Sequence, residues 1–157
     1  MLCGELMAST VVVKITREQV VLMARGWIGT PYHHQASRRG VGTDCLGLVR
    51  GVWRELYGFE AQKPPPYARD WAEAHGEEAM LEAGARHLKN VGAENASIGD
   101  VLIFRYRQGM LAKHAGIMSG PYSFIHAMEG ALVSEVALSP WWRRRLVCAF
   151  SFPGVEG

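Results

Sequence analysis

The sequence predicts a single α+β domain in which N-terminal helices pack on a C-terminal antiparallel β-sheet. Apolar residues recur at helical spacing through much of residues 17–90, whereas short apolar runs separated by turn residues follow residue 95. Helices followed by strands in this way are typical of α+β domains. The chain has 157 residues, a usual size for one domain with one core. We therefore treat 1–157 as one domain, with residues 1–10 loose and 59–95 as a helical insertion.

Two helices are expected before residue 60. Thr16 opens a capping box, which places the first helix at about 17–27. Asp44 is a good N-cap for a second helix, and Gly58 is a plausible stop just past its last turn. The apolar residues of this second helix have the spacing of one buried face: Leu48, Val49, Val52, Trp53 and Leu56. Cys45 therefore falls in the first turn of a buried helix.

The stretch at 59–95 is expected to connect these helices to the sheet. Three consecutive prolines indicate a stiff, polyproline-like connector. Asp70 then caps an alanine- and glutamate-rich stretch, which we interpret as one helix or as two helices broken near Gly76. Such patterns usually belong to packing elements, so His75 and His87 are interpreted as surface residues.

Strands are expected after residue 95. Each predicted strand is a short apolar or alternating run bounded by turn residues. They are placed at 100–106, 114–118, 124–128, 131–138 and 146–152. Because short turns join neighbouring runs, the sheet is predicted to be antiparallel.

Composition and charge disfavour several classes of protein. A net charge of +2 is too small to indicate nucleic-acid binding through electrostatics alone. The three cysteines lack paired spacing, so neither a disulfide framework nor a Cys-x-x-Cys metal site is expected. No apolar run approaches about 18 residues, so no membrane segment is expected. Residues 1–14 lack a basic leader followed by an apolar stretch, so we expect no signal peptide and a protein that is cytoplasmic when made.

Cys45 is the first candidate functional residue. The first turn of a helix offers unpaired N–H groups and the positive end of the helix dipole. Both favour thiolate over thiol, and the thiolate is the nucleophilic form of cysteine. We therefore expect the pKa of Cys45 to lie well below the usual value of about 8.5. The alternative is a small buried cysteine that happens to begin a helix.

Two histidines, His114 and His126, lie inside the predicted strands. If the connecting hairpin pairs residue 114 with residue 126, both imidazoles project from the same face of adjacent strands. That register requires an odd loop, such as 119–121, because an even loop would turn the rings to opposite faces. Same-face histidines beside a helix N-terminal cysteine provide a nucleophile, a base and a group that orients the base.

Two other interpretations remain open. Zinc accepts cysteine and histidine ligands, so Cys45 and the two strand histidines, with adjacent His33 or His34, also fit a metal site. The helix-start position of the cysteine favours a free thiolate, so no metal is expected. Separately, the run at 141–145, WWRRR, fits either a surface for an anionic polymer or tryptophans that pack on the core beside solvated arginines. The second of these is preferred.

The ordered motifs of the chain resemble those of the NlpC family of papain-like cell-wall cysteine peptidases. They are G-T-P-Y, D-C-x-G-L-V, G-D-x-x-x-F, H-A-G-I and I-H-A, and they lie within residues 25–135. The string from Gly29 to Gly58, followed by the segment at 64–73, resembles the branch encoded by phages and gene transfer agents. In that branch the enzyme accompanies the tail. The resemblance implies a papain-like fold and no cofactor.

The resemblance also implies a role for each candidate residue. Cys45 is implied to be the nucleophile, His114 the base, and His126 the residue that orients the base. The Tyr32 hydroxyl is implied to stabilise the oxyanion beside the Cys45 N–H, as a preorganised donor would. Asp44 is implied to help bind a substrate amine.

One departure from the family pattern concerns the substrate. The family commonly has serine directly after the cysteine, where this chain has Leu46. In relatives that bind a free N-terminal L-alanine, that serine and the preceding aspartate help to hold the amine. The amine-binding role of Asp44, and with it the cleavage site in the stem peptide, is therefore left open.

These observations predict a peptidoglycan hydrolase that cleaves amide bonds in stem peptides through a thioester. The resemblance implies cleavage between γ-D-glutamate and a diamino acid. The expected partners are the stem peptide and phage or gene-transfer-agent tail proteins, with no nucleic acid and no membrane, so the protein would reach the wall in a virion tail. The alternatives are an amidase or acyltransferase on the same scaffold, and a catalytically idle tail-tip structural or wall-binding protein. The intact set of Cys45, His114 and His126 disfavours the idle protein.

Overall fold

The computed structural model describes residues 14–61 and 79–156, and within them it confirms the α+β class. The helices are α2 (Arg17–Arg25), α3 (Cys45–Tyr57), α5 (Ala79–His87) and α6 (Pro140–Arg143), with a 3-10 turn, η1, at Ala93–Asn95. The six-stranded sheet has the spatial order β4 (Lys89–Asn90), β9 (Leu146–Ser151), β5 (Val101–Phe104), β6 (His114–Gly120), β7 (Ser123–His126) and β8 (Ser134–Ala137). All neighbours in this sheet are antiparallel. Two short pairs complete the fold: β1 (Ile15–Thr16) with β10 (Val155–Glu156), and β2 (Ser37–Arg38) with β3 (Gly42–Thr43).

The helices begin where their capping residues predict. Thr16 and Gln19 form both hydrogen bonds of a capping box at the start of α2. Gly26 caps the C-terminal end of this helix. The Asp44 carboxylate accepts a hydrogen bond from Gly47 N, 2.7 Å away, at the start of α3. Gly58 ends α3 in the left-handed region, with φ of 82°, a conformation that costs glycine little. The sequence therefore positions Cys45 at the first residue of α3.

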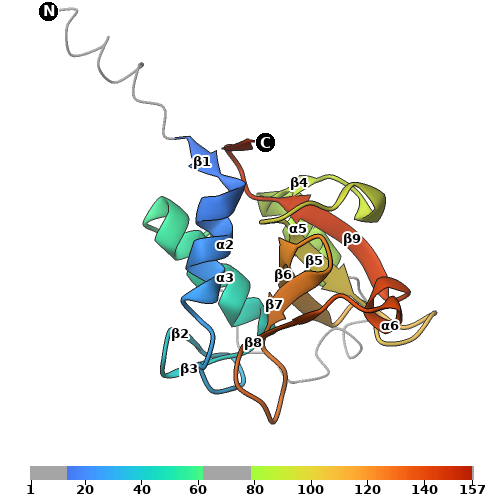
Figure 1. The fold of residues 1–157 in the computed structure, drawn as a ribbon, viewed down its shortest axis with the longest axis horizontal. Helices are drawn as coiled ribbons and strands as arrows, with labels where there is room; N and C mark the ends of the chain where they lie inside the picture. The colour runs from blue at the N-terminus through green and yellow to red at the C-terminus, as the bar shows by residue number, and fades with distance from the viewer. Residues whose placement is uncertain (1–13, 62–78, 157) are drawn as a thin grey trace, which may run out of the picture.

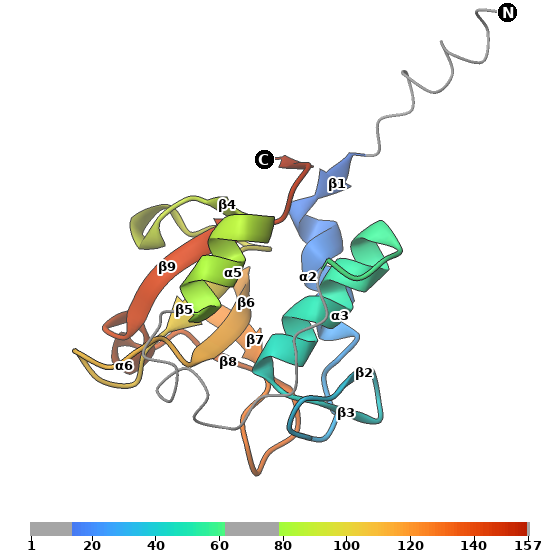
Figure 2. The ribbon, with the colours of Figure 1, turned by 180° about the vertical axis from the view of Figure 1, so that it is seen from behind.

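The sheet separates two hydrophobic clusters. One face of the sheet packs against α2, α3 and α5, and all three helices lie on that side (Figures 1 and 2). Its buried residues include Val20, Leu48 and Val52 from the helices and Val101, Ile103, Ile117 and Ile125 from the strands. The other face carries a smaller cluster made of Leu102, Phe104, Met118, Phe124 and Ala149, with Trp142 from α6 packed against it. The β-strands therefore carry apolar residues on both faces.

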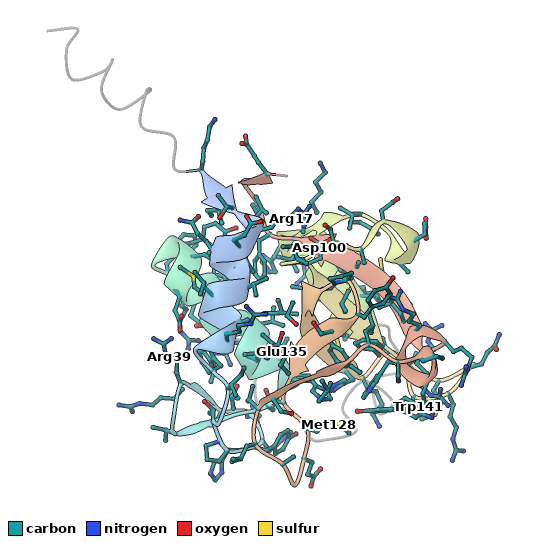
Figure 3. The ribbon with its side chains drawn as sticks, in the orientation of Figure 1. Arg17, Arg39, Asp100, Met128, Glu135 and Trp141 are labelled. Carbon is teal, nitrogen blue, oxygen red and sulfur yellow. The ribbon has the colours of Figure 1, made fainter. Side chains whose placement is uncertain are left out.

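An ion pair joins the first helix to the sheet. Arg17 Nη1 lies 2.7 Å from Asp100 Oδ1, and the two residues are seen next to each other where α2 meets the sheet (Figure 3). Asp100 also accepts a hydrogen bond from Ser97 N. Burial raises the pKa of the Asp100 carboxyl, which the bonds from Arg17 and Ser97 oppose. The aspartate of the G-D-x-x-x-F motif therefore serves the fold.

The register of the β6–β7 hairpin differs from the predicted one. His126 pairs with Gly116 and not with His114. The loop has two residues, 121 and 122, and a β-bulge at Ser119 separates the Met118–Phe124 pair from the Gly120–Ser123 pair. The even loop and the one-residue bulge together restore the parity of an odd loop. The two histidines therefore still lie on the same face, two positions out of the expected pairing.

Other elements were not predicted. The region assigned as a helical insertion contains α5, but it also contributes β4, which pairs with β9 at the edge of the sheet. His87 ends α5 with its ring 6.3 Å from that of Trp53, partly buried and not simply on the surface. Several predictions fall outside the described residues. They concern the three consecutive prolines at 64–66, Asp70, His75, Gly76 and residues 1–10. None of the helices in the described ranges is long and apolar enough to cross a lipid bilayer.

Candidate active site

A cavity of about 290 Å³ lies where the start of α3 meets the sheet. Cys45, His114, Tyr32 and Asp44 all line it. His126 is not among the lining residues, because it lies behind His114. The structure thus brings together the predicted site residues from three distant parts of the chain.

The two histidines form a hydrogen-bonded pair. His114 Nε2 lies 2.8 Å from His126 Nδ1, and the side chains are 3% and 4% exposed. Because Nε2 of His114 is used by this bond, Nδ1 is the nitrogen left to accept a proton from a thiol. In that tautomer, His114 Nε2–H donates to His126, which fixes the orientation of the base.

Burial keeps both imidazoles neutral. It lowers the pKa of His114 to about 3, with a further contribution from His126. It lowers the pKa of His126 to about 4. A buried neutral imidazole is the form that can accept a proton. Both rings are therefore unprotonated at neutral pH and have a lone pair available.

Cys45 contradicts the expectation of a resting thiolate. Burial, with the nearby charge of Asp44, raises the pKa of the Cys45 thiol to about 12. The N–H groups of Ala115, Leu46 and Cys45 itself act in the opposite direction, as a helix start predicts, but burial outweighs them. The thiol donates a long hydrogen bond, 3.9 Å, to the carbonyl oxygen of Lys113, next to His114. At rest the cavity is therefore lined by a neutral thiol and a neutral imidazole.

Asp44 holds the loop that precedes α3. One carboxylate oxygen accepts from Gly47 N and the other from Gln35 N, at 2.7 and 2.8 Å. Gln35 has φ of 65°, in the left-handed region where a side chain is disfavoured, so the bond from its N–H helps to stabilise that conformation. Gly47 packs directly on the carbonyl oxygen of Ala36, where no Cβ would fit. The D-C-x-G motif is thus explained by backbone packing around the cysteine.

Two tyrosines line the cavity beside Cys45. Tyr32 is held by a parallel bridge to Thr43, while Pro31 before it bridges Leu132. Tyr106 was not predicted as a site residue. Its ring stacks on His114 at 5.8 Å. Burial, with the ionisable groups of Cys45 and Tyr32 nearby, raises the pKa of Tyr106 to about 12, so its hydroxyl remains a donor.

The sequence contained no motif for Tyr106, which lies two residues after the phenylalanine of G-D-x-x-x-F. Charged residues at the cavity were also missed: Lys113 and Glu129 both line it. Met128, in the loop after β7, lines it as well (Figure 3). Only the fold brings these side chains to the same cavity.

The histidines at 33 and 34 have different positions. The His33 ring packs against Gly42, whereas His34 lines the cavity. Within residues 14–61 and 79–156, no three His, Cys, Asp or Glu side chains converge as a metal site requires. The described residues thus contain no preformed set of ligands for the zinc alternative.

The chain matches the model of the NlpC/P60 family over residues 29–151. Among curated proteins it is similar to murein DD-endopeptidase MepS/murein LD-carboxypeptidase of Escherichia coli (strain K12), with 27% identity over 121 residues, or 76% of this chain and 54% of the relative. It is also similar to γ-DL-glutamyl hydrolase of Bacillus subtilis (strain 168), with 32% identity over 130 residues, or 81% of this chain and 27% of the relative. The chain therefore spans about half the length, or less, of these relatives.

Solved structures share the fold. The NlpC/P60 domain of the peptidoglycan hydrolase SagA has a TM-score of 0.61 at 22% identity, covering 88% of this chain and 100% of that domain. An NlpC/P60 family protein from Bacillus cereus ATCC 10987 has a TM-score of 0.62 at 18% identity, covering 88% of this chain and 40% of that protein. The expected papain-like fold is thus confirmed.

Proposed function

Because the chain belongs to the NlpC/P60 family, we propose that it hydrolyses amide bonds in peptidoglycan stem peptides, with Cys45 as the nucleophile. One observation carries the proposal: Cys45 and His114 line one cavity, and His126 is hydrogen-bonded to His114 behind it. The names of the curated relatives, a murein endopeptidase/carboxypeptidase and a γ-glutamyl hydrolase, support this class of substrate.

The reaction begins with the neutral thiol. His114 Nδ1 removes the thiol proton as the sulfur attacks the substrate carbonyl carbon. His114 then carries a positive charge, which its Nε2–H bond to His126 Nδ1 stabilises and orients. The oxyanion is stabilised by the Cys45 N–H and the Tyr32 hydroxyl. Because base and nucleophile are neutral at rest, proton transfer accompanies attack and does not precede it.

Breakdown of the tetrahedral intermediate releases the product amine. The C–N bond breaks, and the imidazolium gives its proton to the leaving nitrogen, which leaves a thioester on Cys45. His114 then takes a proton from water, and the hydroxide attacks the thioester. The C–S bond then breaks, the carboxylic acid product leaves, and the His114 imidazolium returns its proton to the Cys45 sulfur.

We place cleavage at the bond between γ-D-glutamate and a diamino acid. A peptide of this kind carries both carboxylate and ammonium groups. The cavity has side chains of both charges, Lys113 and Glu129, which is consistent with such a substrate.

Peptidoglycan digestion tests both the activity and the roles of the residues. Purified sacculi would be treated with the protein, and new amino and carboxyl termini identified by mass spectrometry. Cys45→Ala is expected to abolish release, His114→Ala to be nearly as severe, and His126→Ala to retain measurable activity because it only orients the base. Circular dichroism would establish that each variant is folded. A silent His126→Ala with a mild His114→Ala would mean that the base is misassigned.

The same digest distinguishes the alternatives. An acyltransferase would form the same thioester, but adding an amine acceptor would yield the acceptor adduct in place of a new carboxyl terminus. An idle wall-binding protein would sediment with sacculi and release nothing. Of these, the acyltransferase is the stronger alternative, because Cys45 and His114 line the cavity in either case.

We also propose that the protein works with a phage or gene-transfer-agent tail, on the sequence similarity of residues 29–58 and 64–73 to that branch. Detection of the protein in purified particles, at a fixed ratio to tail proteins, would support this setting. Its absence from purified particles would refute it and would leave the hydrolase proposal untouched.

A further inference from the structure

Trp142 contacts both histidines of the candidate site. Its ring is stacked with that of His114, with centroids 5.4 Å apart and planes 28° apart. It meets His126 edge-on, at 5.4 Å and 89°. One side chain thus touches both members of the hydrogen-bonded pair, and in two different geometries.

Trp142 is also the centre of a larger aromatic cluster. Its ring lies 4.9 Å from that of Phe104, 5.2 Å from that of Phe124 and 6.3 Å from that of Tyr106. Phe104 and Tyr106 contact His114, and Phe124 contacts His126 at 4.7 Å. The imidazoles are therefore surrounded by rings on the sheet face opposite the α2 and α3 helices.

The segment that carries Trp142 is held firmly to the rest of the site. Arg145 Nε donates to Tyr106 O at 3.0 Å, and its Nη1 donates to Trp141 O at 2.8 Å. The guanidinium lies 3.6 Å from the centroid of the Trp141 ring. Trp141 points outward from α6 (Figure 3). Arg105 N donates in turn to Arg145 O at 3.0 Å. These bonds tie α6 to the loop that contains Tyr106.

Titratable groups reach the histidines from several other elements. Cys45 and Asp44 at the start of α3, Tyr32, Tyr106, Lys113 and Glu129 line the same cavity as His114. On the α6 side, Arg143 and Arg145 donate to backbone carbonyls and Arg144 is exposed. Glu135 of β8 forms a salt bridge with Arg25 and pairs with Ile125, one residue before His126. The aromatic rings of Trp142, Phe104 and Phe124 therefore bury the two histidines and carry no charge themselves.

We propose that Trp142 is a positioning residue, which holds His114 and His126 in line with each other and keeps water from their rings. The indole stacks on His114 and meets His126 edge-on, so it restricts the rotation of both imidazoles. It does not line the cavity among the described residues, so it acts through the histidines and not on the substrate. The proposal rests on the proposed roles of Cys45, His114 and His126.

The test replaces Trp142 with leucine and with phenylalanine. Trp142→Leu opens the ring contacts, so kcat is expected to fall by roughly tenfold to a hundredfold with little change in KM. Entry of water should raise the pKa of both imidazoles. The acid limb of the pH profile of kcat/KM should therefore move to higher pH by about one pH unit or more. Trp142→Phe keeps one ring and should restore much of the loss. Trp53→Leu is the matched control, because it removes an indole that packs with its ring centroid 4.4 Å from that of Tyr57 and leaves the ring contacts of His114 and His126 in place.

A second measurement avoids the reaction altogether. Imidazole titrations followed by NMR in a Cys45→Ala background should show both histidine pKa values rising in Trp142→Leu, rising less in Trp142→Phe, and unchanged in Trp53→Leu. Loss of activity with an unmoved acid limb and unmoved imidazole pKa values would overturn the proposal, because Trp142 would then only support the fold. So would unchanged kcat. If Trp142→Leu does not fold, the titrations of Trp142→Phe decide: a smaller rise of both imidazole pKa values supports the proposal, and unmoved values overturn it.

The two proposals fail separately. If His114→Ala remained active, the assignment of His114 as the base would be wrong. The NMR titrations would still decide whether Trp142 sets the pKa values of the two histidines. If the titrations showed no effect of Trp142, the hydrolase proposal would stand on the digestion of sacculi.

Discussion

The acid–base state of individual residues follows from burial more than from sequence neighbours. Cys45 has the N–H groups that favour a thiolate, yet burial and Asp44 raise its pKa to about 12. Burial lowers the pKa of His114 to about 3. Desolvation penalises whichever form is charged. At the scale of single residues, the Cys45 thiol and the two imidazoles are therefore neutral before substrate binds.

The first prediction concerns the resting thiol. Because its pKa is raised, Cys45 should contribute no thiolate absorbance in the ultraviolet through neutral pH. The measurement is the difference spectrum between the wild type and Cys45→Ala as the pH is raised, which cancels the other cysteines. A thiolate signal of one equivalent at about pH 6, below the usual cysteine value of about 8.5, would show that the helix start outweighs burial.

The second prediction concerns Leu46, which lines the cavity directly after Cys45. An apolar side chain offers a substrate ammonium no partner, and both oxygens of Asp44 already accept backbone bonds. The enzyme should therefore cleave N-terminally blocked and free peptides with similar kcat/KM. Leu46→Ser should increase selectivity for the free amine, and Leu46→Ala should not. A wild-type preference of about a hundredfold for the free amine, near 2.7 kcal/mol, would contradict this.

At the scale of elements, the site depends on how α3 begins. Asp44 joins the first turn of α3 to the loop at Gln35 through two backbone bonds. Thr16 caps α2 through a similar bond to Gln19 N, but at an exposed position. The two caps differ in burial and in the number of segments that they connect. The exposed Thr16 cap can therefore serve as the control for the buried Asp44 cap.

The third prediction compares these two caps. Thr16→Ala should cost about 1 kcal/mol of unfolding free energy, the usual value for a lost N-cap. Asp44→Ala should cost about 2–4 kcal/mol, because it also leaves the partly buried Gln35 N–H without its acceptor. Urea denaturation measures both. Equal losses would mean that the Gln35 bond contributes nothing.

At the scale of the whole molecule, the histidine pair links stability to pH. Both folded-state pKa values, about 3 and about 4, lie below the ordinary value of 6.5. The unfolded chain therefore binds more protons than the folded protein between these values and 6.5. Stability is fully present above 6.5 and is lost as the pH falls.

The fourth prediction concerns this loss of stability at low pH. The unfolding free energy should fall by up to about 1.4 kcal/mol per pH unit for each histidine as the pH drops below 6. Denaturant midpoints over this range measure the slope. The double variant His114→Gln, His126→Gln should lose most of the slope, whatever its absolute stability. An equal slope in wild type and double variant would show that other groups cause it.

The sequence by itself determined the features that depend on near neighbours. Thr16, Asp44 and Gly58 mark helix ends through their own backbone and side-chain chemistry, and each lies at the end it predicts. Alternating and apolar runs place the main strands to within a few residues. The candidate residues Cys45, His114 and His126 could be predicted because each lies in such a locally defined element, within a recognisable motif.

The tertiary structure decided what depends on contacts between distant segments. The bulge at Ser119 sets the β6–β7 register, since pairing across the sheet decides where an extra residue is accommodated. β4 exists because β9 offers it a partner, and its two residues carry no strand pattern of their own. The pKa of Cys45 and the place of Trp142 against the histidines follow from burial, which is a sum over contacts from the whole chain. Local sequence encodes the elements, but only the assembled fold determines the environment of their side chains.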